Sequence, residues 1–198
     1  MRRIALTLSL AAGLLLSGCA SLTPQTNSQP SPKFVLEDYF KGRTYAYGVF
    51  EGRDSKLVRS FTVVADGEQA GDTFTLHERF LWNDGEKQTR TWVFKKVGEG
   101  RYEGRAGDVD GVAEVTTLGN AMRIAYGLRL PFGGSTITVH VDDWSHLFAD
   151  GAVINRADVS KFGLHVGRIT LTFIKPDQKR PVAEAIAADV TPPPAPRP

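Results

Sequence analysis

A carboxylate and a guanidinium fall on an otherwise apolar strand face near the middle of the chain. Apolar and polar residues alternate over residues 73–82, and every even position there is apolar except Glu78. Successive side chains of a strand point to opposite faces, so Glu78 shares the face expected to be buried. The Asn-Asp-Gly turn at residues 83–85 predicts a three-residue hairpin loop with Gly85 in the left-handed conformation. That register places Arg90 directly opposite Glu78.

Two interpretations of this pair stay open. As a structural ion pair, it would cost about 3–5 kcal/mol to break by removing one partner. As part of a ligand site, it would orient a guest in a mostly apolar cavity, with Arg90 meeting a ligand carboxylate and Trp82 and Trp92 flanking the guest. Because Arg90 faces it, Glu78 is expected to stay ionised, which suits a general base poorly.

The segment HVDDWSH at residues 140–146 is the most enzyme-like stretch. His140 and Asp142 share a strand face and His146 follows within a turn, so a metal site is conceivable. Ser145, His146 and an aspartate could form a triad, but sequence neighbours point apart and no G-x-S-x-G elbow occurs. A strand that ends here and leads into a short helical turn explains the segment better.

Residues 107–111, with the sequence GDVDG, resemble a calcium loop but lack the acidic spacing and closing Glu of an EF-hand, which favours a β-turn. The chain has no phosphate loop, dinucleotide fingerprint, C-x-x-C or H-E-x-x-H motif. We therefore predict no catalytic residue, no metal ligand and no cofactor.

The N-terminus has the pattern of an export signal. A basic start precedes an apolar stretch over residues 4–16, which is shorter than the ~20 residues of a membrane span. Leu-Ser-Gly-Cys at residues 16–19 resembles the bacterial lipobox, which implies cleavage before Cys19 and a diacylglycerol on its sulfur. Several acyl chains anchor a protein stably to a membrane. Ala20, rather than Asp, then favours the outer membrane, with the protein facing the periplasm.

The elements that must position these residues are almost all strands. We expect a signal peptide at residues 1–18, the lipidated Cys and a flexible tether at 19–33, a barrel domain at 34–175 and a Pro-rich disordered tail at 176–198. Strands are predicted at residues 44–50, 57–64, 73–82, 87–97, 101–106, 112–117, 121–130, 135–142, 153–159 and 166–174. Little helix is expected outside the signal, at residues 35–40 and 143–148. Ten short strands with tight turns suggest an up-and-down barrel or a strongly bent sandwich, and of these we expect a single antiparallel up-and-down barrel.

Tyr126 belongs to a second predicted hairpin, residues 121–130 with 135–142, joined by a four-residue loop. It lies on the apolar face, and the opposite face places Arg123 across from Asp142. Aromatic side chains inside a barrel can be plain core or the wall of a lipid pocket, and the sequence leaves both open.

Composition excludes several classes of protein. Of 198 residues, 41% are hydrophobic and 23% charged, which excludes a disordered chain and a polytopic membrane protein. Lys and Arg number 24 and Asp and Glu 22, and both surplus arginines lie in the first three residues. This balance disfavours nucleic acid as a partner. The single cysteine excludes a disulfide within the chain.

In combination, these motifs resemble the bacterial lipoprotein family catalogued as domain of unknown function 3833 (DUF3833). The matching motifs are Leu76-x-Glu78-x-Phe80, Asp84-Gly85-Glu86, Arg90-x-Trp92, Gly107-Asp108-Val109, Gly119-Asn120-Ala121, Asp142-Asp143-Trp144, Ile154-Asn155-Arg156-Ala157 and Lys161-Phe162-Gly163. The resemblance spans residues 34–175 and implies a lipobox-anchored envelope protein with a lipocalin-like barrel. Ser145-His146 departs from the Met-Tyr-like pair of the family, which counts against a metal site or triad there.

We therefore expect a lipid-anchored barrel that binds or carries a fatty-acid or lipid-like ligand. The predicted ligand-binding residues are Glu78, Arg90, Trp82, Trp92 and Tyr126, and the sequence names no protein partner. One alternative is an envelope-lipid-modifying enzyme that uses Glu78. Another is a structural lipoprotein of an envelope assembly, which predicts an exposed apolar patch and no internal cavity.

Overall fold

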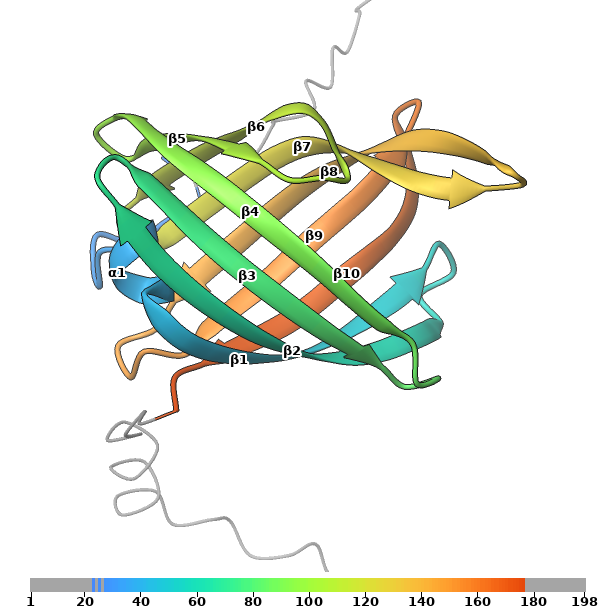
Figure 1. Ribbon diagram of the computed structural model, residues 1–198, viewed down its shortest axis with the longest axis horizontal. Coiled ribbons are helices and arrows are strands. Elements are labelled where there is room, and N and C mark those ends of the chain that lie inside the picture. Colours follow the sequence, from blue (N-terminus) through green and yellow to red (C-terminus); the bar gives the residue numbers. More distant parts are fainter. Residues whose placement is uncertain (1–22, 24, 26, 177–198) are drawn as a thin grey trace, which may run out of the picture.

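The chain forms a closed β-barrel. The computed structural model describes residues 23, 25 and 27–176, and these form ten strands and one short helix. The strands follow one another in chain order and antiparallel, and β1 closes the barrel by pairing with β10 (Figure 1). The predicted fold class is confirmed. The alternation of apolar and polar residues in each strand buries one face inside the barrel.

Most element bounds are close to those predicted, but β2 continues to Ala70 instead of ending at residue 64, because it pairs with β3 along this length, and β8 continues past residue 142. The elements are α1 Leu36–Phe40, β1 Gly42–Gly52, β2 Leu57–Ala70, β3 Thr73–Trp82, β4 Lys87–Gly98, β5 Arg101–Arg105, β6 Val109–Leu118, β7 Ala121–Phe132, β8 Ser135–Leu147, β9 Val153–Lys161 and β10 Leu164–Ile174.

The β3–β4 hairpin has the predicted register. Glu78 lies opposite Arg90, and Phe74 lies opposite Phe94. The amide of Trp82 donates to the carbonyl of Glu86 over 3.0 Å. Gly85 has a φ of 86°, the left-handed conformation that the Asn-Asp-Gly turn predicts.

The β7–β8 hairpin differs from the prediction in its loop. A two-residue turn, Gly133-Gly134 with φ of 55° and 78°, replaces the predicted four-residue loop. The register therefore shifts by two residues, which preserves the faces, because side chains alternate with period two. Arg123 now lies opposite Trp144 and reaches Asp142 diagonally, with 2.6 Å between Nε and Oδ1.

The predicted helical turn at residues 143–148 is wrong. Strand β8 continues to Leu147, because pairing with β7 on one side and β9 on the other satisfies its backbone along this length. Asp143 and Ser145 consequently continue the inward face that begins with Val139 and Val141.

Helix α1 packs across one end of the barrel (Figure 1). Leu36 and Phe40 are buried beneath it, and the Phe40 ring meets Phe173 edge-on at 5.2 Å between centroids. Glu37 on its outer side accepts hydrogen bonds from Lys96 Nζ and the Tyr102 hydroxyl. This end, covered by α1, is the closed end, and the turns that join β1–β2, β3–β4, β5–β6, β7–β8 and β9–β10 all lie toward the other end.

Contacts with the barrel begin before Phe34. The amide of Gln29 donates to Asn120 Oδ1 over 2.7 Å, and the amide of Asn120 donates back to the Gln29 carbonyl over 2.8 Å. His146 Nε2 lies 3.0 Å from the Asn27 carbonyl. The chain thus meets the barrel at its closed end.

The predicted signal peptide at residues 1–18, Cys19 and residues 177–198 lie outside the described residues. Among the described residues, no helix has the length and apolar character needed to cross a bilayer.

Replacing Gly67 by alanine is expected to lower the free energy of unfolding by about 2 kcal/mol. An added Cβ would lie 2.1 Å from the Phe40 carbonyl oxygen and 2.5 Å from Phe74 Cζ, so α1 could not pack against β2 in its present position. Urea unfolding measures the change. Gly107→Ala is the control, because no atom lies within 4 Å of a Cβ built there, and equal stabilities of the two variants would contradict the prediction.

Candidate functional site: a cavity inside the barrel

The barrel encloses a cavity of 700 Å³, within the range of about 300–1,000 Å³ typical of ligand pockets. All five residues predicted to bind a ligand, Glu78, Arg90, Trp82, Trp92 and Tyr126, line it. The aromatic residues inside the barrel therefore form a cavity wall as well as a core. The cavity lies between the end covered by α1 and the open end of the hairpin loops.

The walls near the open end are apolar and aromatic. The rings of Phe61 and Trp82 lie 4.8 Å apart, and Phe80 stacks on Trp82 at 6.4 Å. The guanidinium carbon of Arg59 lies 4.0 Å above the Trp82 ring, and Arg59 also pairs with Glu86 at 2.8 Å. Apolar surface therefore leads from the mouth to the middle of the barrel.

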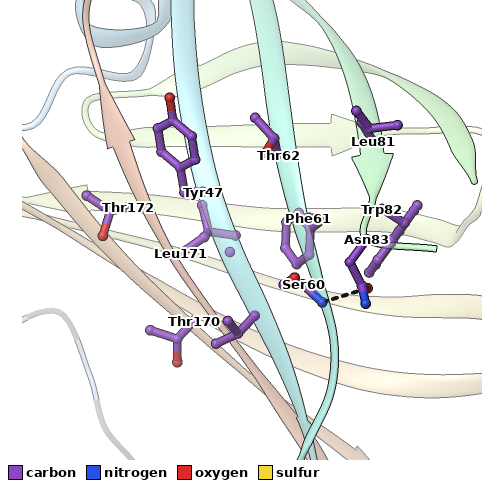
Figure 2. A pocket seen from close by; sticks show the side chains of 12 residues that line it. Tyr47, Ser60, Phe61, Thr62, Leu81, Trp82, Asn83, Thr170, Leu171 and Thr172 are labelled. Carbon is purple, nitrogen blue, oxygen red and sulfur yellow. Dashed lines mark hydrogen bonds between the residues drawn. The ribbon is translucent and has the colours of Figure 1, made fainter. Parts of the chain in front are cut away.

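An outer groove of 620 Å³ crosses β1 at Gly48 on the opposite side of this wall (Figure 2). Tyr47, Thr62 and Leu81 lie side by side on the outer face, and Phe61 occupies the space that a side chain at Gly48 would need. Phe61, like Trp82 and Leu171, lines both hollows, so the barrel wall is thin here.

Glu78, Arg90, Asp108, Asp143 and Asn155 form a polar cluster partway along the cavity, whereas the α1 end of the cavity is lined by apolar residues such as Leu36, Phe40 and Phe173. The ion pair of this polar cluster differs from the expected one. Arg90 pairs with Asp108 rather than with Glu78, its Nη2 and Nε lying 2.6 and 3.0 Å from Asp108 Oδ2. Asp108 belongs to the turn between β5 and β6, where the Val109 amide donates to the Ala106 carbonyl. The predicted turn at this segment thus also supplies the partner of Arg90.

The expectation that Glu78 stays ionised is wrong. Burial raises the pKa of Glu78 to about 7, opposed by Arg90 and reinforced by the negative charges of Asp143 and Asp108. A hydrogen bond from Trp92 lowers the pKa again, but less than burial raises it. Arg90, whose guanidinium is bonded to Asp108, opposes this rise in pKa without cancelling it.

Sequence reasoning missed a second buried carboxyl, Asp143. Burial raises its pKa to about 7, against a hydrogen bond from Asn155 that lowers the pKa. Asn155 Nδ2 donates both to Asp143 Oδ1 and to Ser145 Oγ, the latter over 2.9 Å. The missed signal was the period-two pattern of residues 139–145, which places Asp143 on the face of its apolar neighbours.

The metal candidates His140, Asp142 and His146 occupy alternate positions of β8 and share its outer face, whereas Ser145 of the considered triad lies on the inner face. The Asp142 carboxylate faces outward to Arg123 and accepts from the Trp144 indole at 3.3 Å, whereas Ser145 faces inward. His146 Nε2 contacts the carbonyl oxygen of Asn27, in the segment before α1. In the part of the chain that the structure describes, no three His, Cys, Asp or Glu side chains are grouped to hold a metal ion.

Comparison with known proteins agrees with this architecture. The model of a protein family of unknown function, DUF3833, matches residues 13–175. The chain belongs to this family. No curated protein matches it. Among solved structures, this DUF3833 protein is similar to the S-type phycobiliprotein lyase CPES from Guillardia theta, with a TM-score of 0.53 and 10% sequence identity. The match covers 74% of this chain and 95% of that chain, and it shows the lipocalin-like barrel fold alone.

The DUF3833 barrel described here thus encloses a mostly apolar cavity that contains one polar cluster. The apolar walls can hold a hydrocarbon portion, and the polar cluster of Glu78, Arg90, Asp108, Asp143 and Asn155 can bind a polar group. Two of these residues, Glu78 and Asp143, are carboxyls that change charge near neutral pH.

Proposed function

We propose that this protein is a lipid-anchored envelope protein that binds or carries a lipid-like ligand inside its barrel. The 700 Å³ cavity, which is mostly apolar and contains one polar cluster, carries this proposal. A lipocalin-like fold is compatible with such a role. The cavity also counts against a purely structural lipoprotein, for which we expected none.

The proposed place is the periplasmic face of the outer membrane, with Cys19 as the anchor. The support is the lipobox-like sequence at residues 16–19 and Ala20 after it. The N-terminal segment meets the barrel at Asn120, on the closed end. An anchor attached at this end would leave the mouth directed away from the bilayer.

The ligand suggested by the sequence was a fatty acid, its carboxylate held by Arg90. The geometry favours this detail less than the general class of lipid, since Asp108 already occupies the Nε and Nη2 donors of Arg90. A lipid-like guest in the cavity therefore remains the proposal.

Native mass spectrometry of the chain from residue 20 onward tests this function, because that chain retains every described residue but not the anchor. Purified from the periplasm without detergent, the protein is expected to carry about one lipid molecule per barrel, recoverable by organic extraction. A protein that carries no lipid, and that takes up none from vesicles of its own envelope lipids, would contradict the proposal.

One observation favours the enzymatic alternative. A pKa of about 7 suits Glu78 to donate and accept protons at neutral pH. Chemical comparison of the lipid before and after incubation separates the two functions. A binding protein returns it unchanged, whereas an enzyme returns a product that Glu78→Gln no longer forms.

A further inference from the structure

Buried acceptor atoms of the polar cluster lack hydrogen-bond partners among the described residues. Glu78 is 9% exposed and Asn155 is 4% exposed, and neither Glu78 Oε2 nor Asn155 Oδ1 has a partner among the described residues. The same holds for Asp108 Oδ1. All three residues line the cavity, and all three atoms are oxygens. A group that donates hydrogen bonds would complement them.

The charges of the polar cluster also favour a ligand group that donates hydrogen bonds and is positively charged. Three carboxyls, Glu78 on β3, Asp108 before β6 and Asp143 on β8, face one guanidinium, Arg90 on β4. Arg90 is bonded to Asp108, so Glu78 and Asp143 have no cation of their own. A ligand carboxylate would add negative charge to this region, whereas a cation would offset it.

We propose that the polar group of the ligand is a primary ammonium on an apolar chain, bound in the polar cluster by Glu78, Asp143 and Asn155. This inference rests on the ligand-binding function proposed above and specifies the chemistry of the ligand. The ammonium supplies three donors and one positive charge, and its chain extends along the aromatic walls toward the mouth.

The proposal requires a particular pH dependence. A bound cation favours the ionised forms of Glu78 and Asp143, whose pKa values are both raised to about 7. The other groups that face them are Arg90, Asp108 and the Tyr126 hydroxyl, and Asp142 lies next to Asp143 in sequence. Binding of an ammonium therefore strengthens as pH rises through 7 and releases protons. Binding of a carboxylate has the opposite dependence.

Isothermal titration with three probes of equal chain length tests this inference: dodecylamine, dodecanol and dodecanoic acid, each below its micelle concentration. We expect dodecylamine to bind about 10-fold more tightly than dodecanol, and dodecanoic acid to bind most weakly. Between about pH 6 and about pH 8, the affinity for dodecylamine should rise several-fold, with dodecanol unchanged. Titration in two buffers of different ionisation enthalpy measures the proton release without any variant.

Glu78→Gln is expected to reduce the preference for dodecylamine over dodecanol to about 3-fold and to remove about half of its pH dependence, because Asp143 still ionises near neutral pH. Glu114→Gln is the matched control, since Glu114 is exposed on β6 and the same charge is removed outside the barrel. Its probe preferences should equal those of the wild type.

Three outcomes would overturn the inference. If dodecanol binds as tightly as dodecylamine, or if no protons are released, the polar group is not an ammonium, and the ligand-binding function stands. If dodecanoic acid binds most tightly, Arg90 meets a carboxylate, and only the assignment of the polar group fails. If none of the probes binds, the proposed function fails with it.

Discussion

Replacing Ala157 by tryptophan is expected to weaken ligand binding by at least about 100-fold, with the barrel still folded. Ala157 is buried on β9, lies between Asp143 on β8 and Ile169 on β10, and lines the cavity. An indole at this position would occupy the part of the cavity next to the polar cluster. The cavity has room for the added atoms, so the stability cost should stay near the lower end of the about 1–3 kcal/mol of an overpacked core.

The matched control is Thr170→Trp. Thr170 belongs to the neighbouring strand β10 but lies on the outer face, in the groove of Figure 2. The dissociation constant for dodecylamine and the melting temperature are measured for both variants. If folded Ala157→Trp protein kept wild-type affinity and Thr170→Trp lost it, the binding site would be the outer groove instead of the cavity.

Glu78→Gln is expected to remove about 3 kcal/mol of the pH dependence of stability. The pKa of Glu78 is about 7 in the folded protein and 4.5 at its ordinary value. Its contribution to stability is therefore fully present below about pH 4.5 and is lost as pH rises through about 7, because the unfolded chain releases the proton first. Glutamine cannot ionise and keeps the shape of the protonated acid. The free energy of unfolding of the variant should therefore increase relative to that of the wild type as pH increases.

Urea unfolding between about pH 5 and about pH 8 measures this difference. The two proteins should have similar stabilities near pH 5, and the variant should be the more stable one at pH 8. Glu114→Gln should follow the wild-type curve at every pH. Parallel curves for Glu78→Gln and wild type would mean that Glu78 is ionised throughout, as the sequence suggested.

Local patterns determined the strands and one hairpin. The alternation in residues 73–82 and the turn at Asn83-Asp84-Gly85 were sufficient to place Glu78 opposite Arg90, because both the pleat and the turn type depend on a few consecutive residues. The ten strands and their order were accessible for the same reason. The β7–β8 loop was misjudged because Pro131 was assigned to the loop, although it pairs with Thr136 in the ladder.

The site itself depended on contacts between distant strands. Whether Arg90 bonds to Glu78 or to Asp108 is decided by how the β5–β6 turn approaches β4, and the sequence of the hairpin carries no information on that. Asp143 was assigned to a helical turn because its polar neighbours suggested the end of a strand, whereas pairing with both β7 and β9 extends the strand.

The residues alone thus determined a closed barrel with an acid on its inner face, since side-chain alternation and turn chemistry act over a few positions. Only the tertiary structure decided that the interior is hollow, that two carboxyls there titrate near pH 7, and that three oxygens face the space between them. Cavity volume, burial and electrostatic partners are set by strands that meet across the barrel, far apart in sequence.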